Sequence, residues 1–251
     1  MKETIDGFLK NLKIEETQKY KCNICKDTGY VVIDLIAYPC QCVKSMNKLP
    51  EKLSRTLLKD FNLEFYPRKA INPEKSKDTY YDKALILFSD VKKFVDELEA
   101  GDNYVKGLFI TGPIGSGKTH LVSAIYNELK KSKVDIEFFV VPDLLEQGKA
   151  DMFNENGGRD VFSKAKKAKV LILDDLGAHN YTPWIINQLY SLINYRLNNM
   201  LTTIITTNLR LEDIDIRLDE RIASRILELC SIYNLNVDVD IRYKKNAGLK
   251  Q

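Results

Sequence analysis

Several features are missing from this sequence of 251 residues. No apolar run approaches the roughly 20 residues that a helix needs to cross a bilayer, so no association with membranes is expected. No internal repeat and no low-complexity tract is present. The sequence also lacks a large excess of either sign of charge: 38 Lys and Arg are balanced by 35 Asp and Glu, which gives a net charge of +3. So small an excess neither demands nor excludes a polyanionic partner.

The first residues, MKETIDGFLKNLKIEETQK, lack the apolar segment of a signal peptide. We therefore expect a cytoplasmic protein, whose thiols stay reduced. The length allows one large α/β domain with a small appendage. We expect a small module over residues 1–45, a linker with one short helix over 46–82, and the main domain over 83–251.

Four of the five cysteines cluster between residues 22 and 42. Cys22 and Cys25 form one close pair, Cys40 and Cys42 form another, and the intervening YVVIDLIAY can form a hairpin that brings the pairs together. Four thiolates suit tetrahedral Zn²⁺, so we predict a structural zinc site. Packing cysteines and redox disulfides are the alternatives, and clustering in a cytosolic chain disfavours both. Cys230 lies on an apolar helix face and is expected in the core.

From residue 83 onward, apolar strands alternate with helices. Strands are predicted at GLFIT (107–111), IEFFVV (136–141), KVLIL (169–173) and TTIITT (202–207), with an edge strand within IYNLNVDVD (232–240). Because these strands are apolar almost throughout and helices separate them, the pattern predicts an α/β fold with a parallel sheet covered on both faces.

The turn after the first of these strands fits the phosphate-binding pattern G-x-x-x-x-G-K-[ST] at every fixed position. Its residues are Gly112, Pro113, Ile114, Gly115, Ser116, Gly117, Lys118 and Thr119. Glycines let main-chain N–H groups close around phosphate at a helix N-terminus. Lys118 is expected to reach the β- and γ-phosphates, and the Thr119 hydroxyl to ligate Mg²⁺. His120, the next residue, is expected only to open the helix.

Two carboxylates follow the strand KVLIL. We predict that Asp174 helps to hold Mg²⁺ and that Asp175 orients or deprotonates the attacking water. Asn208 ends the strand TTIITT, where it can sense the γ-phosphate; the alternative is a turn residue that closes the strand. Arg221 and Arg225 lie one helical turn apart, either on a solvated face or as an arginine finger for a neighbouring subunit.

The ordered set GPIGSGKTHL, LILDDLGA, TIITTNL and ERIASRI resembles the AAA+ ATPases, and within them the DnaC/DnaI-type replicative helicase loaders. The resemblance covers most of residues 20–246. It implies that Asn208 is the sensor 1 residue and that Arg225 is the arginine finger, with Arg221 as a second candidate. It also implies that Arg242, in Asp240-Ile241-Arg242, is the sensor 2 arginine, although an arginine in a basic tail is often merely solvated.

Only 26 residues follow Arg225, too few for a separate helical lid domain. Helicase loaders, and the related IstB-type transposition ATPases, resemble AAA+ proteins with little or no such lid. A zinc module ahead of the ATPase core resembles the DnaI branch rather than the IstB type. The chain has only 21 residues before Cys22, fewer than the Bacillus-type loaders, which leaves open how it grips a helicase.

The resemblance implies an ATPase that loads a hexameric DnaB-type helicase onto single-stranded DNA as replication begins. ATP and Mg²⁺ act at subunit interfaces, so the protein would self-associate, while Zn²⁺ is structural. The alternatives are an IstB-type transposition ATPase and a nucleotide-switched adaptor with negligible hydrolysis, because Asp175 stands where many AAA+ proteins have Glu. The basic run Lys164, Lys166, Lys167 and Lys169 is either a DNA contact or a solvated face.

Overall fold

The computed structural model describes residues 24–26, 30–33, 36–39, 49, 51–71, 77–102, 104–152, 161–177 and 181–246. The chain divides into two compact units, Met1–Ser45 and Met46–Gln251. In the smaller unit, β1 (Tyr30–Ile33) pairs antiparallel with β2 (Ile36–Pro39), as the predicted hairpin requires. Cys25 is buried, whereas Cys22, Cys40 and Cys42 lie outside the described residues. The zinc site therefore stays a prediction, and the helix predicted within residues 1–20 also lies outside the described residues.

The larger unit is built on a five-stranded sheet with the order β4-β5-β6-β3-β7. All neighbouring strands in it are parallel, which confirms the predicted fold class. The strands are β3 (Gly107–Thr111), β4 (Ile136–Val140), β5 (Val170–Leu176), β6 (Thr202–Thr207) and β7 (Cys230–Asn234). The predicted edge strand is confirmed as β7, beginning two residues earlier than IYNLNVDVD suggests.

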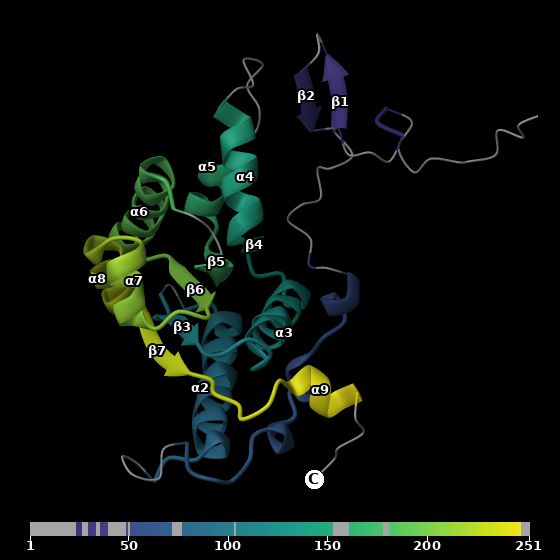
Figure 1. Ribbon diagram of the computed structural model, residues 1–251, viewed down its shortest axis with the longest axis vertical. Coiled ribbons are helices and arrows are strands. Elements are labelled where there is room, and N and C mark those ends of the chain that lie inside the picture. The colour runs from purple at the N-terminus through teal and green to yellow at the C-terminus, as the bar shows by residue number, and fades with distance from the viewer. Residues whose placement is uncertain are drawn as a thin grey trace, which may run out of the picture. The chain divides into compact units, whose positions relative to one another are not determined.

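Alternate residues of each strand point to opposite faces of the sheet, and helices cover both faces (Figure 1). Leu108 and Ile110 pack with α2 (Tyr80–Ala100) and α3 (Lys118–Lys131). Phe109 packs on the other face. The helices of that face are α4 (Val141–Met152), α5 (Val161–Lys167), α6 (Pro183–Asn198), α7 (Leu211–Arg217) and α8 (Glu220–Leu229). The two helix layers thus meet the sheet from opposite sides.

Residues 46–82, predicted as a linker, contribute to the core of this unit through Leu58, Phe61 and Tyr66. Three short 3₁₀ turns replace the predicted helix: Glu51–Leu53, Leu58–Asp60 and Leu63–Phe65. Side chains close two of these turns locally, since Asp60 accepts from the Leu57 N–H at 2.8 Å and Asn62 accepts from the Glu64 N–H at 2.9 Å. Such local bonds compete with a continuous helix.

The structure also contains two helices that periodicity did not reveal, α7 and the short α9 (Ile241–Asn246). Both have fewer than two full turns, so neither offers an apolar stripe long enough to recognise. Within the part of the chain that the structure describes, no helix combines the length and apolarity needed to cross a bilayer.

Candidate functional site

The phosphate-binding loop leaves the carboxyl end of β3 and enters α3, which is the strand–turn–helix setting the motif requires. Gly115 and Gly117 have left-handed φ angles of 75° and 97°. A Cβ on Gly115 would lie 2.0 Å from the Asp240 carboxyl carbon, and one on Gly117 would lie 2.9 Å from the Tyr66 hydroxyl. The backbone conformation therefore favours glycine at both positions, and the Tyr66 hydroxyl also leaves little room for a side chain at Gly117.

Lys118 is buried and folded back over the loop. Its Nζ donates to the main-chain oxygens of Gly112 at 2.7 Å and Pro113 at 2.9 Å. Burial lowers the pKa of Lys118, whereas the charges of Asp174 and Asp175 act in the opposite direction. The ammonium group thus lies at the loop with carboxylates near it, and a phosphate would offer it stronger acceptors than the two carbonyls.

The two residues predicted to hold Mg²⁺ are in contact, although 55 positions separate them in the chain. The Thr119 hydroxyl lies 3.2 Å from Asp174 Oδ1. Asp174 is buried, and burial raises the pKa of its carboxyl, while hydrogen bonds from Thr206 and Thr119 oppose the shift. A hydroxyl and a carboxylate oxygen are the donors that Mg²⁺ prefers, so this pair fits the ion.

Thr206 is a site residue that sequence reasoning missed. Its hydroxyl donates to Asp174 Oδ1 at 2.5 Å and accepts from the Asp175 main-chain N–H at 3.0 Å. Asp175 has a left-handed φ of 63°, and the pairing of β5 with β6 shifts register between Leu173 and Leu176. The irregularity turns the two consecutive aspartates away from regular strand alternation. Thr206 holds the carboxylate of Asp174 and the main chain of Asp175.

Asn208 is exposed and directly follows β6, at the same edge of the sheet as the phosphate-binding loop. Its neighbours are tied to adjacent strands: Thr207 Oγ1 donates to the Leu176 carbonyl, and Thr111 Oγ1 donates to the Leu209 carbonyl, both at 2.5 Å. The turn that carries Asn208 is therefore anchored to both β3 and β5.

The C-terminal segment returns to the phosphate-binding loop. Ile241 N–H donates to the Gly115 carbonyl at 3.0 Å. Arg242 pairs with Asp240 at 3.2 Å, and its charge lowers the pKa of Lys118. Arg242 therefore lies within electrostatic reach of the loop.

A pocket of about 420 Å³ adjoins the loop, between the 3₁₀ turns and α9. It is lined by Phe61, Asn62, Phe65, Tyr66, Lys118, Thr119, His120, Ile241, Arg242 and Lys245, among others. The Phe61 and Tyr66 rings stack with centroids 5.6 Å apart, and the Tyr66 hydroxyl donates to the Ser116 carbonyl at 2.7 Å. No local pattern predicts this aromatic wall, because Tyr66 contacts Ser116 across 50 positions of the chain.

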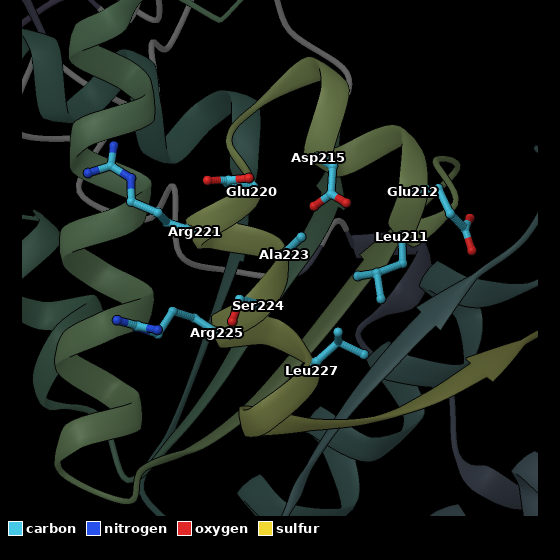
Figure 2. Close-up of a pocket in the computed structure, with 9 residues that line it drawn as sticks. All are labelled: Leu211, Glu212, Asp215, Glu220, Arg221, Ala223, Ser224, Arg225 and Leu227. Atoms are coloured by element: carbon cyan, nitrogen blue, oxygen red, sulfur yellow. The ribbon is translucent and has the colours of Figure 1, made fainter.

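Arg221 and Arg225 lie elsewhere, on α8, and both reach toward α6 (Figure 2). Arg221 is exposed and forms a two-point ion pair with Asp219 at 2.7 and 2.9 Å. Arg225 is half-buried and donates from Nε to Asn194 Oδ1 at 2.9 Å. Both line a cleft of about 480 Å³ between α7 and α8, which shares no residue with the pocket at the phosphate-binding loop.

The basic run before β5 is partly engaged within the fold. Lys164 pairs with Glu137 at 2.9 Å, and Lys166 donates to the Ser191 hydroxyl at 2.9 Å. These contacts favour a solvated, locally paired face over a continuous basic groove.

A profile for the family described as IstB-like ATP binding protein matches residues 90–245, which include the loop, both carboxylates and all three arginines. The chain belongs to this family of ATP-binding proteins. Within it, the chain resembles replicative helicase loaders: the crystal structure of the DnaC helicase loader superposes with a TM-score of 0.58 at 26% identity. That match covers 75% of this chain and 100% of the other, and it confirms the AAA+ type of P-loop core.

Two relatives from Bacillus subtilis (strain 168) are similar in sequence. The phage-like element PBSX protein XkdC is 28% identical over 238 residues, which is 87% of this chain and 82% of XkdC. The replicative helicase loader DnaI is 29% identical over 126 residues, which is 49% of this chain and 40% of DnaI. The match spans most of XkdC but less than half of DnaI, so the activity of a whole loader does not carry over by similarity alone.

Proposed function

We propose that this ATP-binding protein is an ATPase that loads a hexameric replicative helicase onto single-stranded DNA. The proposal depends mainly on one observation: the phosphate-binding loop and the candidate arginine finger lie on opposite faces of the sheet. The phosphate-binding loop opens α3 on one face of the sheet, and Arg225 lies on α8 on the other face. A chain built this way completes a nucleotide site only with a second copy.

The residues at the loop divide the work of nucleotide binding and hydrolysis. The main-chain N–H groups of the loop and Lys118 bind the phosphates, and the contacting pair Thr119 and Asp174 holds Mg²⁺. ATP supplies the phosphoryl group that is transferred to water. Asp175, whose position Thr206 fixes, orients that water.

Asn208 and Arg242 are the remaining residues that the same chain contributes to the site. Asn208 follows β6 at the carboxyl edge of the sheet, where its amide can hydrogen-bond the γ-phosphate or the water. Arg242 now pairs with Asp240 and can exchange that exposed partner for a phosphate oxygen at modest cost.

Arg225 serves the site of the neighbouring subunit. Among the described residues Arg225 forms no ion pair, and Asn194 only orients its guanidinium, so its positive charge is available. Arg221 is the weaker candidate because two of its guanidinium nitrogens already bond the Asp219 carboxylate. Bound ATP thus links subunits into an assembly on single-stranded DNA, and hydrolysis releases the loader. The module at residues 1–45, with zinc held by Cys22, Cys25, Cys40 and Cys42, grips the helicase.

The test is reconstitution with the helicase of the same host. The full chain should co-purify with that helicase when ATP is present and should transfer it to circular single-stranded DNA. Arg225→Ala should still bind ATP but lose DNA-stimulated hydrolysis and transfer, whereas Lys118→Ala should fail to bind ATP. Transfer at the wild-type rate by Arg225→Ala would remove the proposed role of subunit contact.

A transposition-targeting ATPase is the second candidate, since the family profile carries the IstB name. Recovery of a transposase instead of the helicase would favour it. A nucleotide-switched adaptor is distinguished by phosphate release: no turnover with single-stranded DNA and helicase present would favour the adaptor.

A further inference from the structure

We infer that Asp240 restrains nucleotide binding by competing with phosphate for Arg242. The inference rests on the proposed nucleotide site and adds a regulatory contact to it. A triphosphate that reaches the loop has to draw Arg242 away from a carboxylate of the same chain, so the contact between Asp240 and Arg242 is autoinhibitory.

The segment that carries Asp240 is held against the phosphate-binding loop by main-chain hydrogen bonds. Leu235 N–H donates to the Thr111 carbonyl at 2.8 Å, directly before the loop, and Ile241 N–H donates to the Gly115 carbonyl at 3.0 Å, within the loop. Figure 1 shows this segment passing from β7 to α9. Because both of its ends are bonded to the loop region, the side chain of residue 240 lies at the loop.

The Asp240 carboxylate is in contact with the loop itself. A Cβ added to Gly115 would meet all three atoms of the Asp240 carboxyl group, so the carboxylate covers the side of the loop where Gly115 has no side chain. The loop is the part of the chain that is proposed to bind phosphates. A negative charge in contact with it opposes the approach of a second one, because like charges repel strongly at short range.

Arg242 is held by the same carboxylate. Oδ1 of Asp240 accepts from the Arg242 main-chain N–H at 2.8 Å and from its Nε–H at 3.2 Å. The carboxylate therefore offsets part of the positive charge that Arg242 brings to the pocket. The Arg242 side chain is 66% exposed, so the pair is solvated and little free energy is needed to separate it. A phosphate offers several oxygens and more charge than a carboxylate, so it can replace Asp240 as the partner of the guanidinium.

Asp238 has the same charge two residues earlier but has different partners. It pairs with Lys69 at 3.0 Å and with Lys244 at 2.8 Å. Lys244 also donates to the Phe65 carbonyl at 2.8 Å, so Asp238 fastens the segment to the 3₁₀ turns. Of these two carboxylates, Asp240 pairs with the arginine and Asp238 pairs with lysines. Asp238 is therefore the matched control for charge and for attachment of the segment.

The test is a set of calorimetric titrations of the full chain with the non-hydrolysable ATP analogue AMPPCP in the presence of Mg²⁺. Asp240→Asn removes the charge but keeps an Oδ1 acceptor for the Arg242 main-chain N–H. It should bind AMPPCP about three- to fivefold more tightly than wild type, the effect of releasing one exposed ion pair. In an Arg242→Ala background the same substitution should leave the affinity unchanged, because the group that is competed for is gone. Asp238→Asn should bind as wild type does.

Each outcome decides something different. Equal or weaker AMPPCP binding by Asp240→Asn overturns the inference, because Asp240 then only orients Arg242. A gain that persists in the Arg242→Ala background, or that Asp238→Asn reproduces, also overturns it, since the effect is then one of general charge. In these cases the nucleotide site stands. If wild type binds no AMPPCP, the proposed site itself is wrong, and the inference with it.

A measurement on wild type keeps the inference testable should Asp240→Asn fail to fold. Side-chain ¹⁵N spectra report the Nε–H groups of arginines, and Arg242→Ala identifies the signal of Arg242. AMPPCP should shift that signal, because Nε exchanges the Asp240 carboxylate for a phosphate. An unshifted signal at saturating AMPPCP overturns the inference.

Discussion

Replacing Thr206 by valine tests whether its hydroxyl positions the two aspartates of the site. The hydroxyl of Thr206 donates to Asp174 Oδ1 and accepts from the Asp175 N–H. Valine has nearly the same shape but can do neither. The Asp174 carboxylate and the Asp175 main chain would lose the group that holds them, while the strand residue itself would remain β-branched.

The magnitude follows from the two hydrogen bonds. A bond to a charged group contributes about 1.5–3 kcal/mol, and a buried N–H left unpaired costs about 1–3 kcal/mol. These contributions do not add fully, so the free energy of unfolding should fall by about 2–4 kcal/mol. Hydrolysis should fall about tenfold to a hundredfold at saturating ATP, which corresponds to about 1.4–2.8 kcal/mol of activation free energy.

Thr202 provides the matched control at the other end of β6. Its hydroxyl donates to the Val105 carbonyl at 2.8 Å and accepts from the Val105 N–H at 3.4 Å. Thr202→Val should therefore unfold more easily but hydrolyse ATP at the wild-type rate. Steady-state phosphate release and urea unfolding of both variants measure the two effects. Equal hydrolysis by Thr206→Val and Thr202→Val would refute the positioning role.

Three further predictions concern stability and metal. Asp174→Asn should raise the melting temperature of the Mg²⁺-free protein at pH 8 by about 2–4 °C and abolish hydrolysis. Burial raises the folded-state pKa of Asp174, so its ionisation destabilises the folded protein as pH rises through that pKa. The difference in melting temperature between Asp174→Asn and wild type should therefore shrink at lower pH. A difference that does not change with pH would contradict this reasoning. Arg196→Met should lower the free energy of unfolding by about 3–5 kcal/mol. The reason is that the fully buried guanidinium donates to Thr203 Oγ1 and to four main-chain carbonyls. The control Arg55→Met changes an exposed arginine and should lower the free energy of unfolding by less than about 0.5 kcal/mol. Metal analysis should find about one zinc per chain in wild type and far less in Cys25→Ser; zinc-free wild type would refute the four-thiolate prediction.

The sheet and the phosphate-binding loop could be predicted from the sequence, because both depend on local patterns. In strands such as TTIITT, and in the run from Gly112 to Thr119, a few consecutive residues are enough to indicate the local structure. The contact of Thr119 with Asp174 also follows, since the carboxyl ends of parallel strands share one edge. The rest depends on distant residues: Tyr66 reaches Ser116, and Ile241 reaches Gly115. No periodicity within residues 51–66 signals these contacts.

Three side chains show the same limit at the site. Thr206 has the sequence pattern of an ordinary strand residue, and only the neighbouring strand reveals its bonds to the Asp174 carboxylate and the Asp175 N–H. Arg221 and Arg225 look equivalent in sequence, but Asp219 pairs with one of them alone.

The central claim is that a nucleotide bound by one chain is completed by Arg225 of another. Mixing two inactive variants tests it most directly: Arg225→Ala keeps the phosphate-binding loop, and Lys118→Ala keeps the arginine. With single-stranded DNA present, each alone should release no phosphate, and the mixture should recover hydrolysis that rises with protein concentration. A mixture that stays inactive, beside a wild type whose rate per chain does not depend on concentration, would contradict the account.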